Sequence, residues 1–309
     1  MNLLVTGVSG FVGRRLVRQL LRAGDRVCGL VLDLGEADAL GVDPAVRLLQ
    51  ADLLDPRAVG RAVEAAAPEL VVHLGGLSAV GASWTRIPDY YRVNVLGTRH
   101  LVSAVAGAVP VVLASSAEVY GRVAAEDLPL VEDRELRPPS PYALTKACAE
   151  ILVLEAGGLV VRSFNLLGPG QAEGFVLPDF ANQLARIERR EAPPVLHVGS
   201  LEARRDFLHV DDGVAGYEAV VRRGEPGDVY NLASGSSLSI RELLDRLIAL
   251  TGLEVEVRQD PGRTRPVDVP VLEGDNRRLR GLGWSPRFSV ERALRDLWDE
   301  VRGGRCGTG

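Results

Sequence analysis

Few features of secreted, zinc-bound or membrane-spanning proteins occur in this sequence of 309 residues. Its three cysteines, Cys28, Cys148 and Cys306, lie far apart and form no CxxC pair, which argues against a disulfide framework or a metal site. No uninterrupted run of about 18 apolar residues could span a bilayer. The chain opens directly on an apolar segment, without the basic stretch of an export signal. We therefore expect a cytoplasmic protein with no membrane partner and no metal.

An excess of positive charge is also missing. The 36 basic and 41 acidic side chains give a net charge of −5, so composition shows no electrostatic footprint for a nucleic acid. Hydrophobic residues make up 46% and charged residues 25%, as in ordinary globular proteins. The length is sufficient for a large core or for two interlocked lobes. These values predict a globular protein that does not bind nucleic acid.

Lysine is almost absent, since Lys146 is the one lysine among the 36 basic residues. A GC-rich genome produces such a bias by encoding arginine wherever either cation serves. An ammonium group is compact and its pKa can be tuned, whereas a guanidinium stays charged. The retained lysine therefore indicates a position where arginine cannot substitute, with survival by chance as the alternative.

The first half of the chain alternates short apolar runs with segments of helical period, which predicts βαβ units and a parallel sheet. The expected strands are residues 3–5, 26–32, 46–51, 70–74, 109–115 and 159–164. The expected helices between them include residues 11–23, 57–66 and 90–105.

Near Gly168 the pattern changes to loops rich in glycine and proline. Helices are expected at 179–190, 239–251 and 290–301, with one strand at 228–233 that returns to the large sheet. The predicted fold class is α/β, a Rossmann-type doubly wound parallel sheet with a smaller, discontinuous α/β substrate-binding lobe. The dinucleotide-binding part comprises residues 1–167 and about 206–235, the smaller lobe 168–205 and 236–302, and a disordered tail 303–309.

A glycine-rich turn joins the first predicted strand to the first predicted helix. Its glycines let the backbone approach a pyrophosphate, and the helix N-terminus supplies free N–H groups. The motif also occurs in ordinary tight turns, but its strand–turn–helix context favours a dinucleotide. The residues expected to bind the cofactor here are Gly7, Ser9, Gly10, Phe11, Val12 and Gly13.

The choice between NAD and NADP stays open. Asp33 ends the second strand, where an acidic residue would bind the ribose of NAD, whereas Arg14 and Arg15 on the first helix could bind the 2′-phosphate of NADP. Asp52 and Leu53 follow the third strand as a second contact for the cofactor. The Asp52 carboxylate would hold the adenine amino group or, alternatively, cap the next helix.

A tyrosine and the single lysine share one face of a predicted helix. Ser140 is suited to cap this helix and Pro141 to begin it, so Tyr142 and Lys146 stand at i and i+4. A neighbouring ammonium lowers the pKa of a phenol, about 10 when free, by roughly 1–3 units. Such a tyrosine exchanges a proton with a carbinol or carbonyl oxygen, as hydride transfer requires. The alternative is an ordinary helix pair.

The segment after the fifth strand lies at the carboxyl end of the sheet, where open α/β sheets bind ligands. Ser116 could hydrogen-bond the same substrate oxygen as Tyr142. Glu118 is either a base for a C–H group beside a ketone or a polar loop residue, and both interpretations remain open.

Together, the glycine turn, Ser116, Tyr142 and Lys146 resemble the extended short-chain dehydrogenase/reductases that act on nucleotide sugars. The resemblance runs from residue 1 to about residue 300. Segments 163–171, 174–176, 198–207 and 265–270 are similar to the GDP-mannose branch. Within it, the chain resembles the NAD(P)H-dependent reductases that convert the C4 ketone of GDP-4-keto-6-deoxy-D-mannose to GDP-D-rhamnose. GDP-mannose 4,6-dehydratases and 4-epimerases are the alternatives.

The resemblance implies further roles. Leu74, Gly75, Gly76 and Ser115 would bind the cofactor, and Asn165, Val176, Gly199 and Leu201 the nucleotide of a GDP-sugar. Arg205 and Arg265 would clamp its diphosphate, or else pair with Asp206 and Asp268. Asp211 and Asp212 would shape the junction between lobes rather than touch substrate. A homodimer would form through the helices at 90–105 and 142–154.

Three departures from the family pattern bear on the reaction. Gly75 and Gly76 stand where alanines are usual, which predicts a looser loop near the nicotinamide. Ala117 precedes Glu118, so the Asp–Glu pair of the dTDP-glucose dehydratases is missing. The paired arginines after the second strand and the basic stretch after Gln171 are missing too. These last two absences favour a reductase, while Glu118 is what a dehydratase requires. A non-enzymatic NAD(P) sensor is a further alternative, and the intact Ser116, Tyr142 and Lys146 set argues against it.

Overall fold

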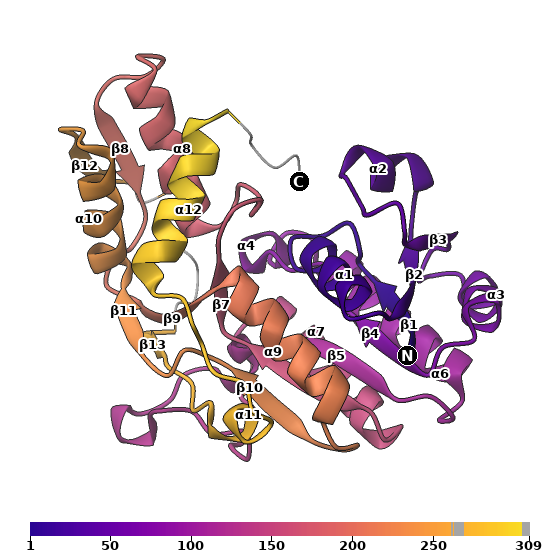
Figure 1. Ribbon diagram of the computed structural model, residues 1–309. Helices are drawn as coiled ribbons and strands as arrows, with labels where there is room; N and C mark the ends of the chain where they lie inside the picture. Colours follow the sequence, from indigo (N-terminus) through magenta and orange to yellow (C-terminus); the bar gives the residue numbers. More distant parts are fainter. Residues whose placement is uncertain (261, 263–268, 305–309) are drawn as a thin grey trace.

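A parallel sheet with helices on both faces forms the larger part of the computed structural model, which describes residues 1–260, 262 and 269–304 (Figure 1). Within this part of the chain its seven strands have the order β10-β6-β5-β4-β1-β2-β3. They are β1 (Asn2–Thr6), β2 (Arg26–Val31), β3 (Arg47–Gln50), β4 (Leu70–His73), β5 (Val111–Ser116), β6 (Leu159–Ser163) and β10 (Val229–Leu232). The order reverses direction between β1 and β4, which opens a ligand crevice at the carboxyl ends of these strands.

The two faces of the sheet are covered because its strands are apolar on both sides. Leu3 and Val5 belong to one core cluster and Leu4 to another, as expected when successive side chains of a strand point to opposite faces. The helices of this part are α1 (Gly13–Arg22), α2 (Leu34–Ala39), α3 (Pro56–Ala66), α4 (Val80–Ser83), α5 (Ile87–Tyr90), η1 (Tyr91–Leu96), α6 (Gly97–Val105), η2 (Ala117–Tyr120), η3 (Ala125–Asp127), α7 (Pro141–Glu155) and α9 (Val210–Arg223). The predicted Rossmann-type fold class is confirmed.

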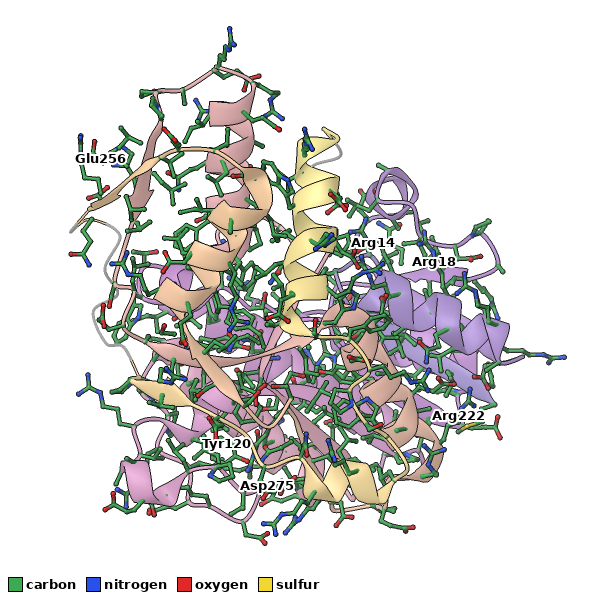
Figure 2. The ribbon with its side chains drawn as sticks, turned by 60° about the vertical axis from the view of Figure 1, so that its left-hand side comes forward. Arg14, Arg18, Tyr120, Arg222, Glu256 and Asp275 are labelled. Atoms are coloured by element: carbon green, nitrogen blue, oxygen red, sulfur yellow. The ribbon has the colours of Figure 1, made fainter. Side chains whose placement is uncertain are left out.

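The smaller lobe has its own apolar core, to which α8 (Val176–Glu188), α10 (Ile240–Thr251) and α12 (Val290–Arg302) contribute. Figure 1 shows these three helices grouped beyond one end of the large sheet. Outside the large sheet, the described residues form the strands β7 (Asn165–Leu167), β8 (Val195–Val198), β9 (Arg204–His209), β11 (Ser237–Ser239), β12 (Glu256–Gln259) and β13 (Val271–Leu272). The short helix α11 (Arg277–Gly281) packs against β10. In Figure 2, Glu256 on β12 lies at the outer edge of this lobe, away from Arg14 and Arg18 on α1.

Two predicted helices differ from the structure. The segment 90–105 is helical but not a single α-helix, since the π-helix η1 stands between α5 and α6. The helix predicted from residue 179 begins three residues earlier, at Val176. Proline is tolerated in a first helical turn because the backbone N–H groups there have no partner within the helix, so Pro178 does not prevent this earlier start. No helix within the described residues has the length and apolar character needed to cross a membrane. Arg265 and residues 305–309 of the expected tail lie outside the described residues.

Candidate active site

A cleft of about 590 Å³ lies between the large sheet and the smaller lobe. The carboxyl ends of β1, β4, β5 and β6 contribute one wall, with the glycine turn and the start of α7. The loop 170–175 and the first residues of α8 contribute the other. The cleft therefore opens where the strand order predicts a ligand.

The glycine turn is packed backbone against backbone. A Cβ atom on Gly13 would lie 2.1 Å from the Gly7 carbonyl oxygen, and one on Gly7 would lie 2.8 Å from the Gly75 nitrogen. The Gly75 N–H in turn donates to Thr6 Oγ1 at 2.9 Å. Glycine is thus required at these positions by close approach, and the turn presents its backbone to the cleft.

The loop after β4 is held on both sides, so the loosening expected from Gly75 and Gly76 is not found. Asn94 Oδ1 accepts from the Leu77 N–H at 2.8 Å, and a Cβ on Gly76 would lie 2.8 Å from the same oxygen. The missing side chain is the reason the loop can approach Asn94 so closely.

The tyrosine–lysine pair faces this cleft from α7. Ser140 caps the helix by accepting from the Ala143 N–H at 3.1 Å, as predicted. Tyr142 and Lys146 follow one turn apart, each 7% exposed, and both line the cleft. Lys146 Nζ donates to the Ala114 carbonyl oxygen on β5 at 2.8 Å.

Ser116 and Glu118 lie in the same cleft. Ser116 ends β5, and its Oγ accepts from the Glu118 N–H at 3.2 Å, which begins η2. The Ser116 hydroxyl also lies close enough to the Tyr142 phenol to favour its charged form. The structure therefore gathers a hydroxyl, a phenol, an ammonium and a carboxylate, which is a set suited to proton transfer at a carbonyl oxygen and at a neighbouring carbon.

Comparison with known proteins agrees with this arrangement. The family model described as GDP-mannose 4,6 dehydratase matches residues 4–297. The chain belongs to this GDP-mannose 4,6-dehydratase family, within the extended short-chain dehydrogenase/reductases. Members of the family are oxidoreductases, dehydratases or epimerases of nucleotide sugars.

Individual relatives differ in the reaction they carry out. GDP-6-deoxy-D-mannose reductase of Pseudomonas aeruginosa is 34% identical, over 96% of this chain and 95% of the relative. The dTDP-glucose 4,6-dehydratase of Streptomyces griseus is 36% identical, over 95% of this chain and 92% of the relative. The solved structure of RMD from Pseudomonas aeruginosa complexed with NADPH superposes on this chain with a TM-score of 0.85 and 31% sequence identity. The match covers 98% of this chain and 100% of that chain.

The pKa of Tyr142 differs from our expectation. Burial raises the pKa of the Tyr142 phenol, and the Ser116 hydroxyl only partly opposes this. The predicted lowering by Lys146 is therefore wrong for the protein alone, because removal of the phenolate from water outweighs the favourable contact with Ser116, and the Glu118 carboxylate raises the pKa further. Burial also lowers the pKa of Lys146 to about 8, against the opposing Glu150 carboxylate. At neutral pH the site holds a phenol and a mostly charged ammonium.

Most of the residues that were predicted to bind the cofactor lie in the cleft. The structure places these residues along it: Gly7, Ser9, Gly10, Phe11, Val12, Gly13, Leu74, Gly75, Gly76, Ser115, Tyr142 and Lys146. Asp33, Asp52 and Leu53 do not line it. Asp33 is exposed just before α2. Asp52 accepts from the Leu54 N–H at 2.8 Å, while Asp55 caps α3, so the alternative role of Asp52 as helix cap is wrong.

The predicted substrate residues divide in the same way. Ser116, Asn165 and Val176 line the cleft, whereas Gly199, Leu201 and Arg205 do not. Leu201 is buried in the core of the smaller lobe. Arg205 is also buried and donates to the Val269 carbonyl oxygen at 2.7 Å.

Asn94 and Gln171 are cleft or cleft-supporting residues that the sequence did not identify as such. Asn94 lies in η1 and donates to the Leu77 carbonyl oxygen at 3.0 Å and to Thr145 Oγ1 at 3.1 Å. Gln171 lines the cleft, and its buried Oε1 has no hydrogen-bond partner among the described residues. A polar amide inside an apolar helical pattern is the one sequence signal that could have indicated Asn94.

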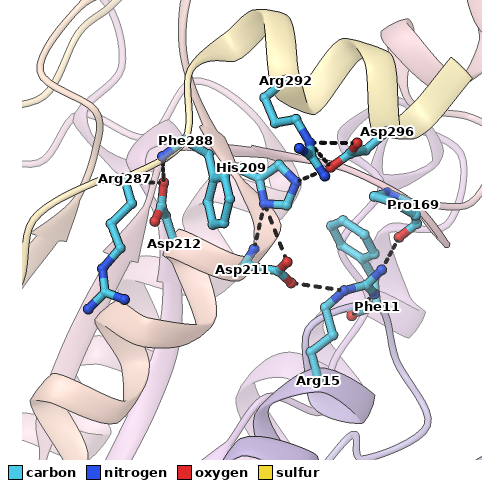
Figure 3. A network of polar contacts seen from close by, with 10 residues as sticks. All are labelled: Phe11, Arg15, Pro169, His209, Asp211, Asp212, Arg287, Phe288, Arg292 and Asp296. Atoms are coloured by element: carbon cyan, nitrogen blue, oxygen red, sulfur yellow. Dashed lines mark hydrogen bonds and ion pairs between the residues drawn. The ribbon is translucent and has the colours of Figure 1, made fainter. Parts of the chain in front are cut away.

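The junction between lobes is a polar network that begins at the glycine turn (Figure 3). The Arg15 guanidinium lies over the Phe11 ring, 5.2 Å from its centre, and pairs with Asp211 at 3.5 Å. The Asp211 N–H donates to His209 Nδ1, and His209 Nε2 contacts Asp296 on α12 at 3.2 Å. The cofactor wall is thereby joined to the smaller lobe.

Asp212 secures the other side of this junction. Its Oδ2 accepts from the backbone N–H groups of Arg287 at 2.9 Å and Phe288 at 2.8 Å, as Figure 3 shows. The Trp284 indole donates to the Asp212 carbonyl oxygen at 2.9 Å. Asp211 and Asp212 thus shape the junction, as predicted. No cluster of three metal-ligating side chains exists within the described residues.

Proposed function

We propose that this chain is an NAD(P)H-dependent reductase that converts the C4 ketone of GDP-4-keto-6-deoxy-D-mannose to the alcohol of GDP-D-rhamnose. The observation that carries the proposal is the Tyr142 phenol, held protonated by burial beside the Ser116 hydroxyl within the cleft. Ketone reduction needs a proton donor of this kind at the carbonyl oxygen. The likeness to the Pseudomonas aeruginosa GDP-6-deoxy-D-mannose reductase supports the choice of sugar and nucleotide.

The residues of the cleft would divide the chemistry among them. A reduced nicotinamide dinucleotide supplies the hydride when bound, and the backbone of the glycine turn suits its pyrophosphate. Ser116 orients the ketone by donating a hydrogen bond to its oxygen. Tyr142 donates a proton to that oxygen as the carbon is reduced, and the Lys146 ammonium stabilises the phenolate that this leaves.

The cofactor we propose is NADPH. Arg14 lines the cleft and donates to the Leu40 carbonyl oxygen at 2.8 Å, which places a guanidinium beside the first helix where a phosphate would be bound. Asp33, the residue that would favour NAD, does not line the cleft. The related structure with NADPH supports the same choice.

We assign residues 1–167 and about 206–235 to the cofactor, and residues 168–205 and 236–302 to the GDP-sugar. Asn165 and Val176 already line the cleft and are proposed nucleotide contacts. Gly199, Arg205 and Arg265 would join them only if the smaller lobe closes on the diphosphate, as lobes commonly do around substrates, whereas Leu201 stays in the core of that lobe.

A homodimer is the proposed assembly. Apolar side chains on η1 and α7, two helices in contact with each other, are exposed in the single chain. They are Tyr91, Leu96, Leu144 and Ile151, of which Ile151 is 56% exposed. Ile151→Glu is expected to yield a monomer in sedimentation equilibrium, and an unchanged mass would reject this interface.

The experiment that tests the reaction follows NADPH absorbance with GDP-4-keto-6-deoxy-D-mannose as substrate. A stoichiometric loss of NADPH and formation of GDP-D-rhamnose are expected, and neither should occur with Tyr142→Phe. No consumption by the wild type would reject the proposed reduction.

Dehydration is the second candidate, because the Glu118 carboxylate lies in the cleft where it could remove a proton from a carbon beside a ketone. The likeness to a dTDP-glucose 4,6-dehydratase supports it. Incubation with GDP-mannose and no added reductant separates the two: a 4-keto product that disappears with Glu118→Gln would establish dehydration.

A further inference from the structure

A buried ion pair stands behind the cleft and takes no direct part in the chemistry proposed above. Arg162 on β6 contacts Glu150 on α7 with Nη2 2.7 Å from Oε2 and Nε 3.1 Å from each carboxylate oxygen. The two side chains are 5% and 2% exposed. A pair buried this deeply loses its hydration and needs further hydrogen bonds to offset the loss.

Those further hydrogen bonds reach both ends of the segment 115–120, which runs from the end of β5 through η2. At one end, Ser115 Oγ donates to Glu150 Oε1. At the other end, Arg162 Nη1 donates to the Tyr120 hydroxyl at 3.0 Å, and the guanidinium lies over the Tyr120 ring, 4.9 Å from its centre. Ser116 and Glu118 lie between these two anchored residues.

The Tyr120 end is itself fixed to the rest of the fold. The Tyr120 hydroxyl donates to Asn231 Oδ1 on β10 at 2.7 Å, and Arg162 Nη1 also donates to the Glu132 carbonyl oxygen at 2.8 Å. Asn231 also donates from its backbone N–H to Glu132 Oε1 at 2.9 Å. The guanidinium thus joins three separate parts of the chain.

The other partner, Glu150, follows Tyr142 and Lys146 along α7 at successive turns of the helix. We propose that the Arg162–Glu150 ion pair is a positioning element that sets the distance between α7 and the segment 115–120. It thereby aligns the phenol and ammonium of one with the serine and carboxylate of the other. Its catalytic consequence rests on the proposed function.

Replacement of Arg162 is expected to displace the catalytic groups, because only a charged, forked guanidinium makes all these contacts at once. A lysine would keep the charge but could not bind Glu150 through two nitrogens while reaching Tyr120. A displacement of about 1 Å in a catalytic group costs about 100-fold in rate. Loss of the fork should therefore lower kcat more than it lowers cofactor affinity.

The pair also determines the surroundings of the single lysine. Lys146 is faced by the Glu150 carboxylate from its own helix, by Tyr142 one turn earlier, and by His73 on β4, while β5 supplies the Ala114 carbonyl oxygen. Burial holds the pKa of Lys146 near 8, and the Glu150 charge opposes that lowering. Because the chain has one lysine, protein made with lysine ¹³C-labelled at Cε gives a single side-chain resonance that reports on this group alone.

The test uses the full chain with Arg162→Lys, Glu150→Gln and Tyr120→Phe, and Glu155→Gln at the exposed end of α7 as the matched control. Arg162→Lys and Tyr120→Phe are expected to lower kcat for the keto sugar about 10- to 100-fold, with the NADPH dissociation constant within about twofold. In Glu150→Gln the NMR titration midpoint of Lys146 should fall below the wild-type value, whereas Glu155→Gln should change neither quantity. Tyr120→Phe keeps the ion pair and the ring, so it serves if the charge variants do not fold.

The outcomes separate the two proposals. If the wild type does not reduce the keto sugar, the proposed reaction fails, and the Lys146 resonance still tests the ion pair without any substrate. A shifted Lys146 resonance in Tyr120→Phe and a lowered midpoint in Glu150→Gln support the positioning role. If the variants lose only thermal stability, while kcat and the Lys146 resonance stay as in the wild type, the pair is merely structural and the proposal is overturned.

Discussion

The Tyr142 phenol lies beside the Ser116 hydroxyl, and burial raises its pKa above the ordinary value. The sign of this shift matters for the reaction. A phenol that stays protonated is a donor ready for the oxygen of a ketone, whereas deprotonation of an alcohol would need the opposite shift. The positive charge of an oxidised nicotinamide would lower the pKa when the reaction runs in reverse.

Replacement of Tyr142 by phenylalanine should therefore remove proton donation and leave the fold intact. We expect kcat for ketone reduction to fall about 100- to 10,000-fold, with NADPH affinity changed little. Stopped-flow absorbance and fluorescence titration measure the two quantities. Tyr230→Phe is the matched control, since Tyr230 lies on β10 and its hydroxyl donates to Asp228. A Tyr142→Phe enzyme of nearly normal kcat would exclude Tyr142 as the donor.

The pH dependence of reduction should follow Lys146. Its pKa is held near 8, so the ammonium that stabilises a nascent phenolate is present below that pH and is lost above it. The raised pKa of Tyr142 keeps the donor protonated over the same range. We expect kcat/KM to decline as the pH rises through about 8. A profile that stays flat from about pH 6 to about pH 10 would contradict this assignment.

Periodicity and turn chemistry were sufficient for the large sheet and for the core of the site. The glycine turn, Ser116, Tyr142 and Lys146 belong to local patterns whose meaning depends only on neighbouring residues. Asn94 and Arg162 do not, because each acts through partners distant in sequence. Arg162, for example, bonds Glu132 across 30 positions.

Two other differences between sequence and structure have simple physical causes. Asp52 has the right residue type for a helix cap, but Asp55 stands directly before α3 and accepts from Arg57 and Ala58. Leu201 occurs in a segment that resembles a substrate turn, yet its side chain belongs to a core that forms only when α8, α10 and α12 assemble. Local position in the chain decided the first of these differences, and tertiary packing decided the second.

His73 predicts how stability changes with acid. Burial and the nearby Lys146 lower its pKa from 6.5 to about 3, so the unfolded chain binds a proton more readily than the folded chain between these values. Stability is therefore lost as the pH falls below 6.5, and the loss continues down to about pH 3. From about pH 7 to about pH 4.5 this single group should cost about 2 to 3 kcal/mol of unfolding free energy.

Urea titrations of the wild type and His73→Gln at the two pH values isolate this contribution from that of the other titrating groups. Glutamine can still bridge Thr6 and Thr98, the hydroxyl partners of the two ring nitrogens. The variant should lose less stability in acid than the wild type by about the same 2 to 3 kcal/mol. His100→Gln is the control, and equal acid sensitivity in His73→Gln and the wild type would show that His73 is not the group responsible.

The choice of cofactor rests on Arg14, which can be separated from its neighbour one turn along α1. Arg14 lines the cleft, whereas Arg18 does not line it and donates to the Gly41 carbonyl oxygen at 3.2 Å. Loss of one charged hydrogen bond to a phosphate should weaken NADPH binding about tenfold or more. Arg14→Ala is thus expected to raise the dissociation constant of NADPH and to leave that of NADH within about twofold. Arg18→Ala should leave both constants unchanged. Equal weakening of NADPH and NADH by Arg14→Ala would instead place the guanidinium at the pyrophosphate that the two cofactors share, and the preference for NADPH would then have to arise elsewhere in the cleft.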